Sequence, residues 1–226
     1  MMNGSITMDT TPDAHRRTRN WAVRGAVAAG RGAALFWLTL AALWLWVVLL
    51  IAVSLAPLGV GLAMIPGPLR AMRRLENAVR RRSADWCGVA IGVPYLPEPA
   101  GWGERVPGEP PGFWQRFLFL LADPATWRDL VWTAADVLFG WVLTLAPLGL
   151  LAWGLFGLAM PAVWHPIDMA GGNNWYAFIH VDSASRAWLS VALGVVFIAA
   201  GLLSGPWLLR RYGLFARWML APAHTA

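Results

Sequence analysis

Lysine is absent from this chain of 226 residues, so all 18 of its basic side chains are arginines. The absence excludes any site that needs a lysine, such as a Walker-type phosphate site or a Schiff-base centre. Cysteine is nearly absent as well, because Cys87 stands alone, and this excludes an intramolecular disulfide. The sequence also lacks a His-Glu-x-x-His zinc motif and a nucleophile elbow. We therefore predict a protein without enzymatic activity, metal or other cofactor.

Charge is scarce too, at 13% of residues, whereas soluble domains carry about a quarter. The apolar residues gather in three runs without any charge, at 33–69, 137–164 and 187–209. About 20 apolar residues in a helix cross a hydrocarbon core of about 30 Å. These runs predict an all-α integral membrane protein.

The first apolar run, 33–69, is too long for one ordinary crossing, because a single helix of this length would reach about 55 Å. Arginines flank it on both sides, and the positive-inside rule favours a cytoplasmic location for both flanks. We therefore predict a hairpin with a break near residues 54–59. A re-entrant segment remains the alternative for its short second leg.

Of the 18 arginines, Arg186 alone falls on the predicted outer side, which predicts a multi-pass protein of the cell membrane with both termini in the cytoplasm. About four transmembrane helices are expected, as two hairpins. The predicted segments are a largely disordered basic cytoplasmic tail (1–32), the first membrane hairpin (33–69), a cytoplasmic basic helix, Pro/Gly loop and interfacial helix (70–129), the third membrane helix (130–164), an extracytoplasmic loop (165–186), the fourth membrane helix (187–209) and a cytoplasmic tail (210–226).

An amphipathic, basic helix is predicted at residues 69–86, between the two hairpins. Arginines near a membrane surface attract anionic lipid, and they also orient a chain in the bilayer. Both roles are compatible with this helix, and nucleic-acid binding is not expected because no such motif is present. The candidate anionic-lipid contacts are Arg70, Arg73, Arg74, Arg80, Arg81 and Arg82.

The loop at 165–186 is the sizeable polar segment on the predicted outer side, so an external signal is expected to act there or within the bilayer. Two imidazoles and two carboxylates in this loop have ligand chemistry for a transition metal, but their spacing fits no dedicated site, and solvated side chains are the favoured interpretation. The candidate signal residues are His165, Asp168, Trp175, Tyr176, His180 and Asp182.

Asp136 is an acidic residue placed inside a predicted membrane helix, about two turns after Asp129. Such a residue is a functional hypothesis by default. A structural pairing with Arg210 or Arg211, at the inner end of the last crossing, is preferred over a proton relay because no second intramembrane acid accompanies it.

A faint internal repeat offers a second functional class. The pentapeptide Leu-Ala-Pro-Leu-Gly occurs at 55–59 and again at 145–149. Membrane transporters often contain internal repeats, so a membrane subunit of a transporter is the alternative hypothesis, although chance is a serious rival in so apolar a chain.

Three short segments of the chain are distinctive. They are Arg73-Arg74-Leu75-Glu76, the dipeptide Pro94-Tyr95 and, most specifically, Asp123-Pro124-Ala125-Thr126-Trp127-Arg128-Asp129-Leu130. Together they resemble the actinobacterial "putative sensor" domain family. The resemblance extends over about residues 33–222. The family usually shows Glu-Arg where this chain has Glu76-Asn77.

Domains of this family form the membrane input region of two-component histidine kinases. The resemblance therefore implies a non-enzymatic sensory or regulatory module that passes a signal to a cytoplasmic partner, or acts through a homo-oligomer. The kinase part that follows in such proteins is not expected here, because His224 lies in a short tail without the context of a phospho-acceptor. The chain is expected to be either a free-standing sensor or a fragment.

Overall fold

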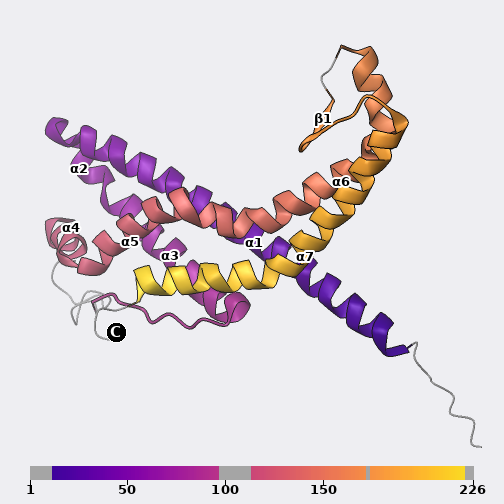
Figure 1. Ribbon diagram of the computed structural model, residues 1–226. Helices are drawn as coiled ribbons and strands as arrows, with labels where there is room; N and C mark the ends of the chain where they lie inside the picture. The colour runs from indigo at the N-terminus through magenta and orange to yellow at the C-terminus, as the bar shows by residue number, and fades with distance from the viewer. Residues whose placement is uncertain (1–11, 97–112, 172–173, 222–226) are drawn as a thin grey trace, which may run out of the picture. The chain divides into compact units, whose positions relative to one another are not determined.

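The computed structural model describes residues 12–96, 113–171 and 174–221, and over these residues the regular secondary structure is helical apart from two very short strands (Figure 1). The elements are α1 (Pro12–Ser54), η1 (Ala56–Leu58), α2 (Val60–Met64), α3 (Pro66–Cys87), α4 (Phe113–Ala122), α5 (Pro124–Ala135), the π-helical turn η2 (Asp136–Gly140), α6 (Trp141–Met169), β1 (Trp175–Tyr176), β2 (Ile179–His180) and α7 (Ala184–Leu220). The predicted all-α class is confirmed.

Helix α1 begins far earlier than the sequence suggested. Residues 12–32 are helical, where a largely disordered tail was predicted. The segment is rich in alanine and arginine, which favour helix, and packing completes it: Ala28 and Ala29 are buried. A Cβ atom at Gly25 would collide with the carbonyl of Leu202 in α7, so the two backbones are in close contact there.

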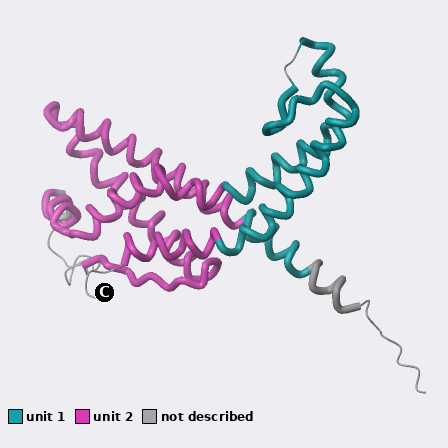
Figure 2. Tube along the Cα trace, viewed as in Figure 1, with its two compact units in different colours: residues 1–30, 146–207 teal, residues 31–145, 208–226 magenta. Residues whose placement is uncertain are grey.

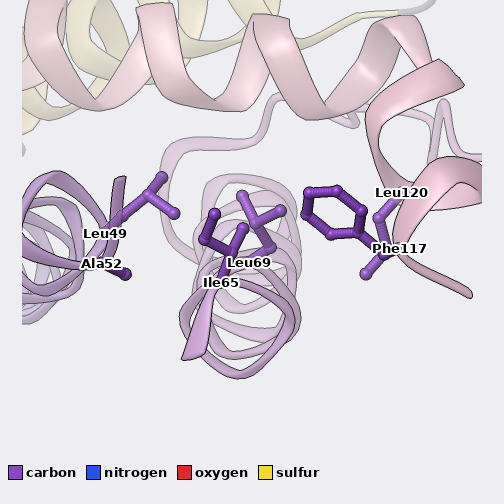
Figure 3. Packing of buried hydrophobic residues seen from close by; sticks show 6 residues of the cluster. All are labelled: Leu49, Ala52, Ile65, Leu69, Phe117 and Leu120. Atoms are coloured by element: carbon purple, nitrogen blue, oxygen red, sulfur yellow. The ribbon is translucent and has the colours of Figure 1, made fainter. Parts of the chain in front are cut away.

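A helical hairpin follows, with its turn where the break at 54–59 was predicted. Helix α1 ends at Ser54, and Gly59 adopts a positive φ of 81°, which glycine tolerates best. Helix α3 then returns beside α1: Ile65 and Leu69 lie between the end of α1 and helix α4 (Figure 3). At the other end of the hairpin, the Arg31 guanidinium lies 5.9 Å from the ring centroid of Trp86.

Three helical segments in the described part of the chain are long and apolar enough to cross a membrane: Asn20–Ser54, Pro124–Met169 and Ala184–Leu220. The second leg of the hairpin, formed by α2 and the arginine-rich α3, is not among them. A fourth crossing at this leg therefore remains a prediction.

Helix α7 extends to Leu220, well beyond the predicted end of the last crossing at residue 209. The stretch predicted as a tail stays helical because a buried stripe with helical spacing runs along it, formed by Leu209, Tyr212, Ala216 and Leu220.

The chain divides into two compact units (Figure 2). Unit 1 comprises residues 1–30 and 146–207, and unit 2 comprises residues 31–145 and 208–226. Helices α1 and α7 contribute to both units, and α6 passes from unit 2 into unit 1 near residue 146.

Candidate functional site

Asp123 caps the N-terminus of helix α5. Its carboxylate accepts a hydrogen bond from the backbone N–H of Ala125 at 3.0 Å, as an N-cap residue does, and Pro124 occupies the first helical position. The Thr126 hydroxyl donates to the carbonyl of Leu120 at 2.8 Å and so ties this turn to α4. The motif Asp-Pro-x-Thr therefore fixes how α5 leaves α4.

Arg73 of α3 reaches the same turn. Its guanidinium donates to the Asp123 carboxylate at 2.8 Å and also to the Thr126 hydroxyl. Asp123 is almost fully buried, and a buried carboxylate needs a charged or hydrogen-bonding partner. The ion pair therefore fastens α3 to the first turn of α5.

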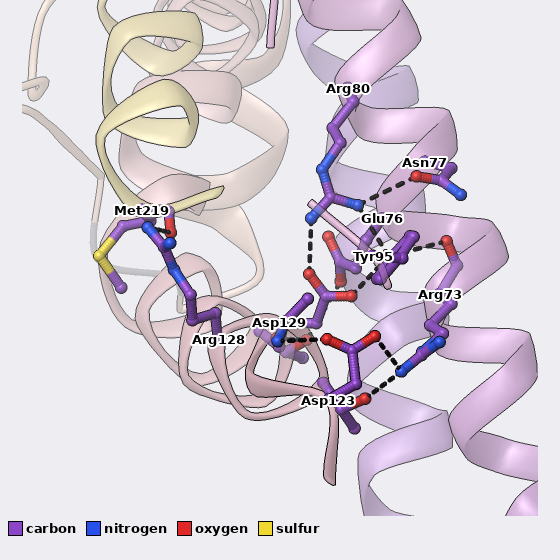
Figure 4. A network of polar contacts seen from close by, with 12 residues as sticks. Arg73, Glu76, Asn77, Arg80, Tyr95, Asp123, Arg128, Asp129 and Met219 are labelled. Carbon is purple, nitrogen blue, oxygen red and sulfur yellow. Dashed lines mark hydrogen bonds and ion pairs between the residues drawn. The ribbon is translucent and has the colours of Figure 1, made fainter. Parts of the chain in front are cut away.

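Two turns further along α3, Arg80 forms a second and deeper ion pair. It donates to Asp129 of α5 at 2.7 Å, and both side chains are only 2% exposed. The Tyr95 hydroxyl donates to the other oxygen of Asp129 at 2.6 Å and accepts from Arg80 at 2.8 Å. Figure 4 shows these groups facing one another between the two helices.

Tyr95 lies between the two arginines. The guanidinium carbons of Arg73 and Arg80 are 4.7 and 5.1 Å from its ring centroid, within the range of cation–π contact. The non-helical segment that contains Tyr95 is thus held against α3 and α5. Arg73, Arg80, Tyr95, Asp123, Thr126 and Asp129 together form the polar network.

Burial and charge shift the pKa values of those network residues that lie outside the predicted membrane-spanning segments. Burial is the largest influence on the pKa of Arg80 and lowers it, but the charge of Asp129 and the contacts with Asp129 and Tyr95 together outweigh burial and raise that pKa overall. Burial, and then Asp129, raise the pKa of Tyr95, which favours the neutral hydroxyl that donates to Asp129.

Glu76, on the same side of α3, is a buried acid with few partners. Burial, followed by the charges of Asp129 and Asp136, raises its pKa well above the ordinary value. Its Oε1 accepts from the Thr133 hydroxyl at 3.2 Å, while Oε2 has no hydrogen-bond partner among the described residues. The folded protein therefore keeps the neutral carboxylic acid to higher pH than the unfolded chain does.

Asp136 begins the π-helical turn η2 and is buried. The structure gives it two hydroxyl partners: Thr39 of α1 donates to its carboxylate, and so does Tyr212 of α7, at 3.4 Å. The predicted partners were Arg210 or Arg211, so the contact comes from the neighbouring residue of α7 instead. A Cβ at position 140 would collide with this carboxylate, so Gly140 leaves room for it.

The six arginines proposed as lipid contacts separate into two groups. Arg73 and Arg80 point into the polar network, and Arg80 is too buried to meet lipid, which corrects the prediction for that residue. The others are at least partly exposed: Arg70, Arg74 and Arg81 are exposed, and Arg82 lies over Trp86 at 5.4 Å. Lipid contact by these four remains a prediction.

In unit 1, the predicted signal loop contains an anchored β-hairpin. Strands β1 and β2 pair antiparallel, with Trp175 opposite His180 and Tyr176 opposite Ile179. Tyr176 is fully buried, and its hydroxyl donates to the carbonyl of Trp153 in α6 at 2.9 Å.

The Tyr176 ring stacks on Trp153, with centroids 5.7 Å apart and an angle of 10° between the planes, and it also meets Phe197 of α7 edge-on at 6.2 Å. A Cβ at Gly157 would collide with the Tyr176 hydroxyl, so this glycine of α6 forms the seat of the ring. The hairpin is therefore wedged between α6 and α7.

Of the remaining candidates of the loop, His180 lies close to Trp175 and to Asp182, with 3.8 Å between His180 Nδ1 and an Asp182 carboxylate oxygen, whereas His165 and Asp168 make other contacts. The ring centroids of His180 and the exposed Trp175 are 5.1 Å apart with the planes tilted by 39°, and Asp182 forms an exposed ion pair with Arg186 at 2.8 Å. His165 lies beside Trp164 near the end of α6, and the carbonyl of Asp168 accepts from Gly171. In the described part of the chain, no three His, Cys, Asp or Glu side chains lie close enough together to hold a metal ion.

The structure thus unites the three segments that were singled out in the sequence. Arg73, Tyr95, Asp123 and Asp129 come from those segments and touch one another. The sequence analysis missed the roles of Glu76 and Arg80. One signal was present, because charged residues recur seven positions apart: two arginines on α3, Arg73 and Arg80, and two aspartates on the facing segment, Asp129 and Asp136. Residues seven apart share one side of a helix.

Comparison with protein families gives a match over most of the chain. The model of the family described as "Putative sensor" matches residues 26–220, which is most of the chain and includes both units in large part. Neither a curated protein nor a solved structure shows significant similarity to the chain.

Proposed function

Because the chain belongs to the "Putative sensor" family, we propose that it is a membrane sensory or regulatory module that passes a signal to a cytoplasmic partner. The signalling would be of the two-component type, with the partner a separate protein or a second copy of the chain. The signal would enter at the hairpin of the predicted outer loop or within the bilayer. The basic helix α3 and the arginine-bearing end of α7 would form the cytoplasmic surface.

The observation that supports this proposal best is the seat of Tyr176. An aromatic side chain from the loop is fully buried between the two helices that the loop connects. A ligand that moves the hairpin must therefore change how α6 and α7 pack around it. Packed helices have few alternative arrangements, so such a change is suited to switching.

The route for the signal is the helices themselves. Helix α7 continues from the Tyr176 seat to Tyr212, which contacts Asp136, and to Met219, whose carbonyl accepts from Arg128. Helix α6 is continuous with η2 and α5, which precede it along the chain. The first half of α5 contributes Thr126 and Asp129 to the polar network. A shift of either helix would act on the ion pairs that fasten α3.

The test replaces Tyr176 by alanine in the native host and measures genome-wide transcription against a deletion strain. We expect the Tyr176→Ala strain to match the deletion strain, because the hairpin loses its anchor. The control is Phe178→Ala, which removes an aromatic ring that is 76% exposed on the same hairpin and should leave transcription unchanged.

Membrane levels of both variants are compared by immunoblot. A Tyr176→Ala strain with normal protein level and wild-type transcription, beside an altered deletion strain, would refute entry of the signal at this hairpin. A deletion strain with unaltered transcription would refute the regulatory role itself.

A further inference from the structure

An apolar groove opens in unit 2 between helices α1, α3, α4 and α5. Its volume is about 570 Å³, within the range of pockets that hold small molecules. It adjoins the buried cluster of Figure 3, with which it shares Leu49, Leu69 and Phe117. Trp46, Leu130 and Ala134 also line the groove.

The wall of the groove excludes most polar ligands. Among its lining side chains, Thr126 has a hydroxyl, but Arg73 and the carbonyl of Leu120 already engage it. The indole of Trp127 donates to Leu121 at 2.9 Å, whereas the indole N–H of Trp46 is buried and has no acceptor among the described residues. The groove therefore suits a hydrocarbon chain.

The surroundings indicate where such a chain comes from. Two of the four walls, α1 and α5, belong to segments that are long and apolar enough to cross a membrane. Their groove residues Leu50, Val53 and Val131 are about half exposed or more in the protein alone. In a bilayer this opening would face acyl chains rather than water.

Positive charge lies next to one wall. Arg70 follows the lining residue Leu69, and Arg74 lies one helical turn further on the same side of α3. Both side chains are exposed, and neither forms a hydrogen bond or ion pair within the part of the chain that the structure describes. They are free to meet a negative group just outside the groove.

We propose that this groove binds one acyl chain of an anionic membrane lipid, with Arg70 and Arg74 holding the phosphate of its headgroup. The inference rests on the proposed sensory function, for which it names a ligand class. A bound lipid would affect the polar network, because Thr126 lines the groove and its hydroxyl also accepts a hydrogen bond from Arg73. Bound lipid would thus bias how α3 is fastened to α5.

The experiment reconstitutes the purified chain in bilayers of equal phosphatidylglycerol and phosphatidylcholine, extracts it in mild detergent and counts bound lipids by native mass spectrometry. We expect one retained lipid, enriched in phosphatidylglycerol. Ala134→Trp should abolish most of the retention, because Ala134 is exposed in the groove and a large ring there fills the space. Ala192→Trp is the matched control, at an exposed alanine of α7 outside the groove.

Replacing Arg70 and Arg74 by glutamine should keep the lipid but reduce its phosphatidylglycerol preference by about fivefold for each arginine, from the usual strength of such contacts. Leu50→Trp, at another exposed position of the groove, is the groove-filling variant to use if Ala134→Trp does not fold. Equal lipid retention in the groove variants and in Ala192→Trp would overturn the proposal. So would a wild-type dimer that becomes monomeric in Ala134→Trp, since a second copy would then fill the groove. Because retention is measured on purified protein, the groove can fail while the response to Tyr176→Ala still supports the sensory function.

Discussion

The side chains of the polar network contribute unequally to the stability of the fold, and we expect the Arg80–Asp129 ion pair to contribute most. Arg80→Ala would leave the Asp129 carboxylate buried without its cation. We expect this to cost about 3–5 kcal/mol of stability, the usual cost of breaking a buried ion pair. Thermal unfolding in detergent measures the loss.

Arg81→Ala, one residue away and exposed, is the control for that substitution and should change stability by about 0.5 kcal/mol or less. Replacing both partners, as in Arg80→Met with Asp129→Leu, should cost less than Arg80→Ala alone, because no unpaired charge remains. Equal effects of Arg80→Ala and Arg81→Ala would show that the pair does not stabilise the fold.

Glu76 should make stability depend on pH. Its pKa is raised in the folded state, so the folded protein keeps the proton that the unfolded chain releases above about pH 4.3. Stability is therefore lost as pH rises from that value towards the folded pKa. Glu76→Gln removes this titration, so it should gain stability relative to wild type between pH 4 and pH 8, as measured by unfolding midpoints. Parallel pH profiles for the two proteins would contradict a buried neutral Glu76.

The sequence predicted which residues of the network matter better than it predicted their partners. The capping of α5 by Asp123 involves only neighbouring residues, so it is visible in the local sequence. The pairing of Arg80 with Asp129 depends on how α3 faces α5, and that packing is not visible in either helix alone. Arg73 and Arg80 were therefore assigned to the lipid surface, although they turn inward.

At the scale of elements, helix α6 and the β-hairpin should be coupled through a single glycine. Gly157→Ala would place a methyl group where the Tyr176 hydroxyl now lies, and should therefore loosen the hairpin. Hydrogen exchange of residues 174–181, followed by mass spectrometry, should speed up in this variant.

The matched substitution is Gly149→Ala in the same helix, where an added Cβ meets nothing within 4 Å. It should leave exchange of the hairpin unchanged and favour the helix, by up to about 1 kcal/mol. If the two variants exchange alike, Gly157 is not the seat of Tyr176.

Element boundaries followed the sequence where the signal was local and departed from it where packing decided. The turn after Ser54 was predicted, whereas the start of α1 and the end of α7 were not, because buried alanines and the stripe of α7 extend these helices. The repeated pentapeptide is instructive: it forms a turn at 55–59 and the interior of a helix at 145–149. Identical residues thus adopt different structures, which gives the repeat no structural support as a duplication.

At the scale of the whole molecule, sensing across a bilayer requires the hairpin of the loop and the basic helix α3 to lie on opposite sides. The family match and the three apolar helical segments support a membrane sensor, while the orientation of the chain remains a prediction from its arginines. Cys87, the sole cysteine, is buried, and burial raises the pKa of its thiol to about 11. We therefore expect the wild-type chain to react little with thiol reagents, which suits it to cysteine labelling.

The most direct measurement labels two single introduced cysteines in intact cells with a membrane-impermeant maleimide. Ala177→Cys lies on the hairpin and Ala84→Cys on α3, and both positions are exposed. We predict that the hairpin cysteine reacts in intact cells and that the α3 cysteine reacts only after the membrane is permeabilised. Reaction of both cysteines in intact cells, or of neither before permeabilisation, would place the hairpin and α3 on the same side and contradict transmission of a signal across the membrane.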